Sequence, residues 1–261
     1  MTFNRAIVRR PSPAVTQGLR ACNRGDPCYE RVLEEHAAYC AALSAAGVTV
    51  TTLPELGEFP DALFVEDTAL VFSDAAILLR PGAPARRGEI EFIEPELHRF
   101  FPRVQRLPES GCADGGDVLV TADGVLIGLS TRTDPAGAQL LLQALAAIGR
   151  AARIVRTPAG VLHFKSDCAL LDPETVLSTQ RLAAAGFFAG LRVLLVPEGE
   201  DAAANALRIN DTVLLSAGFP RTLELLEAQG FNVVTLQTAE VAKIDAGLSC
   251  MSLRWLDAAH N

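Results

Sequence analysis

The sequence lacks the signals of a nucleic-acid-binding or membrane protein. Its 261 residues carry 31 acidic side chains against 23 basic ones, for a formal net charge of −8. Nucleic-acid-binding surfaces are basic, so this balance argues against such a partner. No apolar run approaches the roughly 18–20 residues that span a bilayer, and the first residues hold no apolar stretch of signal-peptide length. We therefore expect a cytoplasmic protein without membrane contact, acting as a monomer or homodimer.

Closely spaced cysteine pairs are also missing. None of the six cysteines forms a C-x-x-C pair, so the pattern does not predict a zinc site. Without an export signal, the thiols are expected to stay reduced rather than form a disulfide framework. Phosphate-binding loops and dinucleotide fingerprints are absent as well. We expect no metal and no cofactor. The cysteines are Cys22, Cys28, Cys40, Cys112, Cys168 and Cys250.

What the sequence does contain is an internal repeat. Four segments each consist of two apolar runs joined by a polar turn, as in the Ala-Asp-Gly turn at 122–124, which is a strong hairpin signal. Helical patterns follow three of these hairpins. The hairpin segments are 66–82, 116–133, 166–180 and 205–222, and the helices are expected over Glu89–Phe101, Pro135–Gly149 and Leu223–Gln229.

A fifth unit is divided between the two ends of the chain. A strand over Ser249–Trp255 opens it, and the N-terminal strand Ala6–Arg10 is the candidate partner. A helix over Tyr29–Ala46 and a strand over Val48–Leu53 complete it. Five such units closing into a ring would leave no exposed sheet edge. The pattern thus predicts an α/β fold that forms one domain over residues 1–261.

Ring closure has a chemical consequence, because the polar residues that open each unit's first strand would meet near the axis. The sequence then predicts a pocket with several carboxylates, one histidine and one cysteine. The converging residues are Glu66, Asp67, Asp114, Asp117, His163, Lys165, Asn205, Ser249 and Cys250.

Two of these residues can carry covalent or proton-transfer chemistry. Cys250 can act as a thiolate nucleophile, although a cysteine is more often a small buried side chain. His163 can serve as general acid and base, with a structural histidine as the alternative. His36 and His98 lie in helical patterns with charged neighbours, which predicts exposure to solvent.

The charged residues suit a guanidinium ligand that carries a carboxylate. Asp61, Glu66 and Asp67 could form paired, charge-assisted hydrogen bonds with a guanidinium, or belong to a solvated turn. Arg86 and Arg132 follow the second strands of their hairpins, which places each on a loop. Two such arginines could hold a carboxylate, and two ordinary surface arginines are the alternative.

An ordered set of motifs spans the chain. FPDALFVEDTAL, RPG-x3-RRGE, DGGDVL, GLSTRT, HFKS, AANALRIN and LSCMSLR occur in this order. Together they resemble the dimethylarginine dimethylaminohydrolase family of the guanidino-group-modifying (amidinotransferase) superfamily. The resemblance implies the pentein fold, a five-bladed pseudosymmetric α/β propeller of ββαβ units, in agreement with the repeat.

The resemblance also implies roles for individual residues. Cys250 matches the nucleophile, His163 the general acid and base, and Asp114 the carboxylate that accompanies the histidine. Glu66 and Asp67 match carboxylates that hold the guanidinium nitrogens, and Asp61 helps to hold the amino-acid end. The remaining substrate-binding matches are Leu19, Phe64 and Ile244, together with Arg86 and Arg132 at the substrate carboxylate.

A family member would hydrolyse Nω-methylated arginines to citrulline and dimethylamine or methylamine, through a covalent alkylthiouronium on the cysteine. The expected partner is thus a small cationic amino acid. Two alternatives stay open at this point. One is another guanidine hydrolase of the superfamily, such as an arginine deiminase-like enzyme, and the other is a non-catalytic protein that binds a cationic amino acid.

Overall fold

The structure is a computed structural model that describes residues 2–21 and 23–258. These residues form two compact units. We call the described residues up to Val65 and from Val196 onward the terminal unit, and Glu66–Leu195 the central unit. The expectation of a single catalytic domain stays a prediction.

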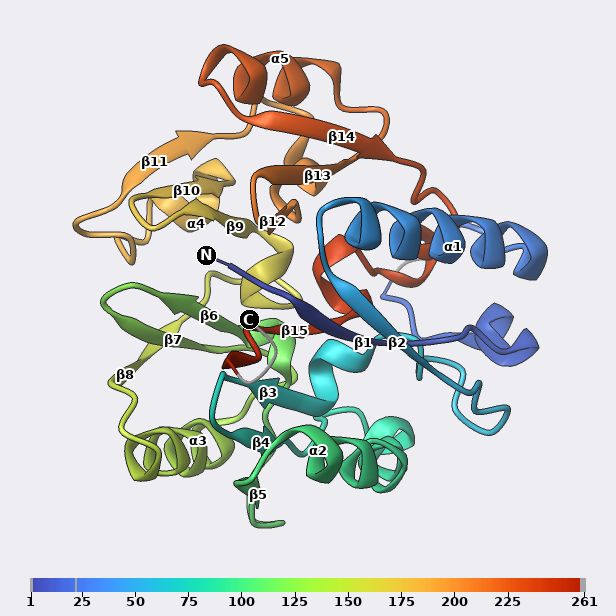
Figure 1. Ribbon diagram of the computed structural model, residues 1–261. Coiled ribbons are helices and arrows are strands. Elements are labelled where there is room, and N and C mark those ends of the chain that lie inside the picture. The colour runs from blue at the N-terminus through green and yellow to red at the C-terminus, as the bar shows by residue number, and fades with distance from the viewer. Residues whose placement is uncertain (1, 22, 259–261) are drawn as a thin grey trace. The chain divides into compact units, whose positions relative to one another are not determined.

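The central unit holds three sheets of identical topology (Figure 1). In each sheet an antiparallel hairpin is followed by a helix and then by a third strand parallel to the second. Each sheet is thus one ββαβ unit. They are β3 (Ala69–Val71), β4 (Ala76–Leu78), α2 (Glu94–Phe100) and β5 (Val104–Arg106); β6 (Val118–Thr121), β7 (Gly124–Leu129), α3 (Pro135–Ala147) and β8 (Ala152–Arg156); and β9 (Cys168–Asp172), β10 (Thr175–Ser178), α4 (Gln180–Ala183) and β11 (Arg192–Leu195).

The terminal unit holds two further sheets of the same topology. One contains β12 (Leu207–Ile209), β13 (Thr212–Ser216), α5 (Pro220–Ala228) and β14 (Asn232–Leu236). The other joins the chain ends, as the repeat predicts: β15 (Leu253–Trp255) pairs antiparallel with β1 (Arg5–Arg9), and β2 (Thr49–Leu53) pairs parallel with β1 after helix α1 (Tyr29–Ala45). The described residues therefore form five ββαβ units, the number expected from the sequence.

The expected single helix over Glu89–Phe101 is wrong. A 3₁₀ helix spans Pro84–Phe92, and α2 begins separately at Glu94. Pro95 lies in the first turn of α2. Proline has no N–H to donate and is tolerated in a first turn, so a new helix begins there instead of continuing the old one.

A short 3₁₀ helix precedes the first strand of each of the five ββαβ units, where extended backbone was expected. Residues predicted to open a strand therefore lie on or beside a tight turn, and Cys250 is one of them. Because the N–H of Cys250 bonds to the carbonyl of Gly247 at 3.3 Å, this part of the backbone does not join a sheet ladder. The turns span Val65–Thr68, Gly115–Asp117, Phe164–Ser166, Asp201–Ala204 and Leu248–Met251.

The terminal unit and the central unit each contain buried apolar clusters. In the terminal unit α1 contributes Tyr39 and Leu43, both fully buried. In the central unit α3 contributes Leu141 and Leu145. The expected exposure of His36 is wrong, because this residue lies on the buried face of α1, and burial lowers its pKa to about 4.

None of the described helices is both long and apolar enough to cross a membrane. The five cysteines within the described residues are free thiols, and Cys22 lies outside those residues.

Candidate functional site

His163 forms a pair with a buried carboxylate of the central unit. Its Nε2 lies 3.0 Å from Oδ2 of Asp114, whose side chain is 1% exposed. The second carboxylate oxygen accepts the N–H of Gly82 at 2.7 Å, and the Asp114 N–H donates to Oγ1 of Thr133 at 3.0 Å. Both ends of Asp114 are thereby fixed, so its orientation toward the imidazole is fixed as well.

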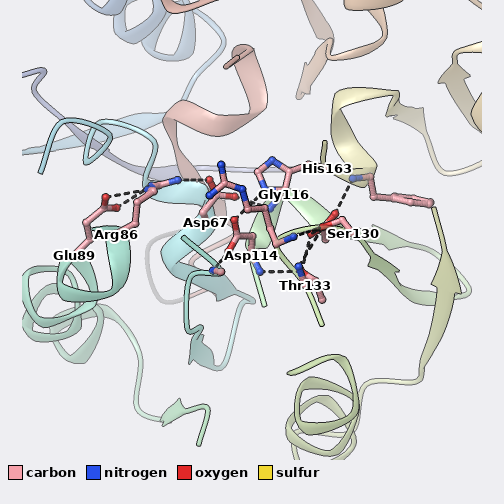
Figure 2. A network of polar contacts seen from close by, with 12 residues as sticks. Asp67, Arg86, Glu89, Asp114, Gly116, Ser130, Thr133 and His163 are labelled. Atoms are coloured by element: carbon pink, nitrogen blue, oxygen red, sulfur yellow. Dashed lines mark hydrogen bonds and ion pairs between the residues drawn. The ribbon is translucent and has the colours of Figure 1, made fainter. Parts of the chain in front are cut away.

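A second carboxylate, Asp67, lies between an arginine and the histidine (Figure 2). The Arg86 guanidinium donates to Asp67 at 2.5 Å and forms a two-pronged contact with Glu89 at 2.9 and 2.8 Å. The other Asp67 oxygen accepts the Gly116 N–H at 2.9 Å. A Cβ at Gly116 would lie 2.9 Å from the His163 ring and 3.0 Å from Asp67, so only glycine fits between them.

These charges set the protonation state of His163. Burial by itself would lower the pKa of the imidazole. The charge of Asp67 and the hydrogen bond to Asp114 outweigh burial, with a further contribution from Asp117, and raise the pKa of His163 to about 9. Burial would likewise raise the pKa of Asp67, but the charges of His163 and Arg86 hold it below its ordinary value. An imidazolium between carboxylates is the form expected at neutral pH.

One oxygen each of Asp67 and Asp114 and a ring nitrogen of His163 lie within 4.8 Å of one another. Among the described residues this is the one group with a geometry that could hold a metal ion. The Arg86 guanidinium pairs with Asp67, and the raised pKa of His163 favours a second positive charge beside these carboxylates. The expectation that no metal is required stays a prediction.

A third carboxylate, Asp117, is fully buried. Its Oδ2 accepts hydroxyl hydrogens from Ser130 at 2.6 Å and from Thr133 at 2.7 Å. Its Oδ1 accepts the Phe164 N–H at 2.9 Å. Burial raises the pKa of Asp117, although the His163 charge and these donors oppose the effect. The sequence contained no signal for the role of either hydroxyl.

The two arginines expected to hold a carboxylate differ in their surroundings. Arg86 lies on a 3₁₀ helix rather than on a loop, and it is buried against Asp67 and Glu89. Arg132 does lie on a loop, between β7 and α3. Its guanidinium has no hydrogen-bond or ion-pair partner among the described residues of the central unit. Of the two, Arg132 is thus the one whose charge is not already offset by neighbouring carboxylates.

Glu66, expected at the substrate guanidinium, forms an ion pair in this structure. Its Oε1 accepts from Nζ of Lys165 at 2.6 Å, and both side chains are largely buried. Lys165 had no predicted role beyond its place at the start of a unit. Glu66, Asp67, Asp114, Asp117, His163 and Lys165 therefore do come together within the central unit, as the repeat predicts.

The terminal unit positions four of the predicted binding residues. Asp61 is buried and accepts the backbone N–H of Leu19 at 3.0 Å. Phe64 is buried three residues later. Ile244 is also buried, and its side chain packs against Gly18, where an added Cβ would lie 3.1 Å from it. Three of the four thus share a contact chain through the segment at residues 18–19.

Cys250 lies on the 3₁₀ helix Leu248–Met251 and is half-buried. The neighbouring Ser249 donates its N–H to Oδ1 of Asn205 at 3.0 Å and accepts from Nδ2 of the same amide at 3.3 Å. A Cβ at Gly247 would lie 2.6 Å from Asn205, so glycine permits this close approach. The asparagine therefore fixes the turn that carries the cysteine.

Sequence reasoning missed two long-range contacts, at Ala21 and at Cys28. The Cys28 N–H donates to Glu240 at 2.7 Å, and the Ala21 N–H donates to Asp245. Asp245 has a positive φ of 56°, which ends the 3₁₀ helix Val241–Ile244. These contacts join residues more than 200 positions apart, which local patterns do not predict.

The chain is similar to known proteins over nearly its whole length. The model of a family described as arginine deiminase matches residues 54–185. The N(G),N(G)-dimethylarginine dimethylaminohydrolase of Pseudomonas aeruginosa is 39% identical over 254 residues, covering 97% of this chain and 100% of that protein. The protein of the same name from Streptomyces coelicolor is 36% identical, covering 97% of this chain and 98% of the relative.

Among solved structures, that of the Pseudomonas aeruginosa protein, a cysteine-to-serine variant complexed with citrulline, matches with a TM-score of 0.94. It is 38% identical to this chain, with 97% of this chain and 100% of that chain covered. This similarity confirms the predicted fold class, the α/β propeller of five ββαβ units.

Proposed function

Because the chain belongs to the dimethylarginine dimethylaminohydrolase family, we propose that it hydrolyses Nω-methylated arginines. Asymmetric dimethylarginine would yield citrulline and dimethylamine, and monomethylarginine would yield citrulline and methylamine. The observation that carries the proposal is the group formed by His163, Asp67 and Asp114. It supplies a proton donor among carboxylates that suit a cationic substrate.

Cys250 is the proposed nucleophile. A guanidinium resists attack because its charge is delocalised, so the carboxylates of Glu66 and Asp67 must fix its plane and concentrate positive charge at the central carbon. The thiolate then forms a bond to that carbon and gives a tetrahedral adduct. The substrate cation favours the thiolate form, since an opposite charge stabilises an ionised group.

His163 is the proposed general acid and base. Its pKa of about 9 leaves it protonated in the free enzyme at neutral pH. It gives this proton to the departing nitrogen as the C–N bond breaks, which releases neutral dimethylamine and leaves an S-alkylthiouronium on Cys250. The neutral imidazole next takes a proton from water, whose oxygen attacks the same carbon. Collapse of that adduct breaks the C–S bond: the sulfur leaves as the Cys250 thiolate, the hydroxyl proton passes to solvent, and citrulline is released.

The substrate's amino-acid end is assigned to a second set of residues. Arg132 is the proposed partner of the α-carboxylate, because no neighbouring carboxylate of the central unit offsets its charge. Arg86 has a smaller share in that contact, since Asp67 and Glu89 already neutralise it. Contacts from the terminal unit to the substrate are assigned to Leu19, Asp61, Phe64 and Ile244.

The proposal also covers the cellular compartment, the oligomeric state and the partners of the enzyme. The free thiols of the described cysteines suit the reducing conditions of the cytoplasm. We place the enzyme there as a monomer or homodimer, with no cofactor and with neither nucleic acid nor membrane as a partner.

A substrate panel tests the proposed reaction. Dimethylarginine, monomethylarginine, arginine and agmatine are offered separately. The ureido product (citrulline, or its decarboxylated counterpart from agmatine) and the released amine or ammonia are measured. The proposal expects citrulline together with dimethylamine or methylamine, in equal amounts. The matching arginine deiminase family model favours one alternative, the release of ammonia from arginine. Preferred turnover of arginine over both methylated substrates would contradict the proposal.

A further inference from the structure

Asp117 lies between two parts of the central unit that the proposed reaction uses. It is fully buried and has three hydrogen-bond donors on its two oxygens. No step of the proposed reaction involves its carboxylate. Its donors are Ser130, Thr133 and the N–H of Phe164, and each of them leads to a residue that the proposed reaction uses.

One side of the carboxylate leads to Arg132. Ser130 donates its hydroxyl hydrogen to Asp117 at 2.6 Å. The same hydroxyl oxygen accepts the backbone N–H groups of Arg132 at 2.9 Å and Thr133 at 3.1 Å. The position of the loop that carries the Arg132 guanidinium therefore depends on the orientation of the Ser130 hydroxyl, which Asp117 sets.

The other side leads to His163. Oδ1 of Asp117 accepts the N–H of Phe164, the residue directly after the histidine, at 2.9 Å. Thr133 donates to Asp117 at 2.7 Å and accepts the N–H of Asp114, the carboxylate paired with the imidazole, at 3.0 Å. Both the backbone of the histidine and its carboxylate partner are thus tied to Asp117.

We propose that Asp117, through Ser130 and Thr133, is a positioning residue that couples binding of the substrate α-carboxylate at Arg132 to the alignment of His163. This inference rests on the proposed function, because it takes Arg132 and His163 in the roles assigned above. Its consequence is that a substrate without the α-carboxylate loses rate in the chemical step as well as affinity.

The chain offers a matched control in the next repeat. Asp67, Asp117 and Asp167 follow one another at intervals of 50 residues. Asp167 is also buried and accepts the hydroxyl of Thr179 at 2.7 Å, the same contact as that between Asp117 and Thr133. Thr179 is the N-cap of α4, and neither residue contacts an arginine or histidine of the proposed mechanism.

The test compares kcat and KM for dimethylarginine and for its decarboxylated counterpart in the wild type, Ser130→Ala, Thr133→Val and Thr179→Val. In the wild type, kcat is expected to be lower for the decarboxylated substrate. Ser130→Ala should lower kcat for dimethylarginine by about 10- to 100-fold, the loss that follows small misplacement of catalytic groups. The same variant should leave kcat for the decarboxylated substrate nearly unchanged.

The two threonine variants separate positioning from general destabilisation. Thr133→Val and Thr179→Val should lower the unfolding midpoint alike, while Thr133→Val alone lowers kcat. Three results would overturn the inference: equal wild-type kcat for both substrates, a Ser130→Ala effect on KM alone, or equal losses of kcat with both substrates. If the wild type turns over arginine instead of methylarginines, the proposed substrate is wrong. The inference about Asp117 is then tested by the same measurements with arginine and agmatine as the substrate pair.

Discussion

Replacement of Asp67 by asparagine tests the electrostatics of the site in the free enzyme. The Asp67→Asn change keeps the shape of the side chain and leaves an acceptor for the Gly116 N–H, but it removes the charge beside His163. Arg86 retains its two-pronged contact with Glu89, so no buried charge is left unpaired. The substitution therefore isolates one charge without removing a packed side chain.

The expected magnitude follows from the surroundings of the imidazole. The charge of Asp67 is the largest single effect that raises the His163 pKa to about 9, from an ordinary value of 6.5. Removal of an opposite charge at such short range lowers a pKa by about 1 to 3. This range corresponds to about 1.4 to 4 kcal/mol of lost stabilisation of the imidazolium.

The assay is an NMR titration of the histidine ring signals between pH 5 and pH 10, without substrate. Asp74→Asn is the matched control, because Asp74 makes an exposed ion pair with Arg150 in the same unit, on the turn between β3 and β4. The His163 titration should move to lower pH in Asp67→Asn and stay in place in Asp74→Asn. An unchanged midpoint in Asp67→Asn would refute the account of the site's charge.

Three further predictions concern substrate binding, in the first two, and the dependence of folding stability on pH, in the third. Arg132→Ala should raise the KM for dimethylarginine by an amount equivalent to about 2–5 kcal/mol, as for one side of a buried charged contact, and an unchanged KM would exclude the α-carboxylate role. Asp61→Ala leaves the Leu19 N–H without its acceptor and should raise KM with a smaller effect on kcat, measured by steady-state kinetics. The third concerns stability: because the folded-state pKa of His163 is raised, its contribution of about 3 kcal/mol is complete below pH 6.5 and is lost as pH rises toward about 9. Urea unfolding of the wild type and His163→Asn should therefore differ most at pH 6 and least above pH 9, and a constant difference would contradict this reasoning.

The repeating architecture could be predicted because each unit carries its own local signals. The two-residue turn before Gly124 and the helix after Asp134 depend on neighbouring residues only. The pairing of β15 with β1 followed from counting units, since a fifth unit needed both chain ends. The 3₁₀ turns escaped prediction, because their geometry depends on partners far along the chain, such as Asn205 for the turn of Cys250.

The sequence predicted which residues belong to the site better than it predicted the contacts between them. His163, Asp114 and Asp67 were recognised from motifs, and the structure brings them together. The contacts of Arg86 with Glu89 and Asp67 were not predicted, because the sequence pattern placed Arg86 on a loop and the structure places it on a 3₁₀ helix. The contact of Asp67 with Arg86 joins residues 19 positions apart, on two separate 3₁₀ helices, and is fixed only by the folded backbone.

The nucleophile assignment is the centre of the account, and trapping of the covalent intermediate tests it most directly. The enzyme is mixed with dimethylarginine labelled at the guanidino carbon, quenched with acid during turnover and digested, and the labelled peptide is identified by mass spectrometry. The account predicts the label on the peptide that contains Cys250, and its loss in Cys250→Ser together with loss of turnover. Label on another cysteine, or citrulline formation at the normal rate by Cys250→Ser, would contradict it.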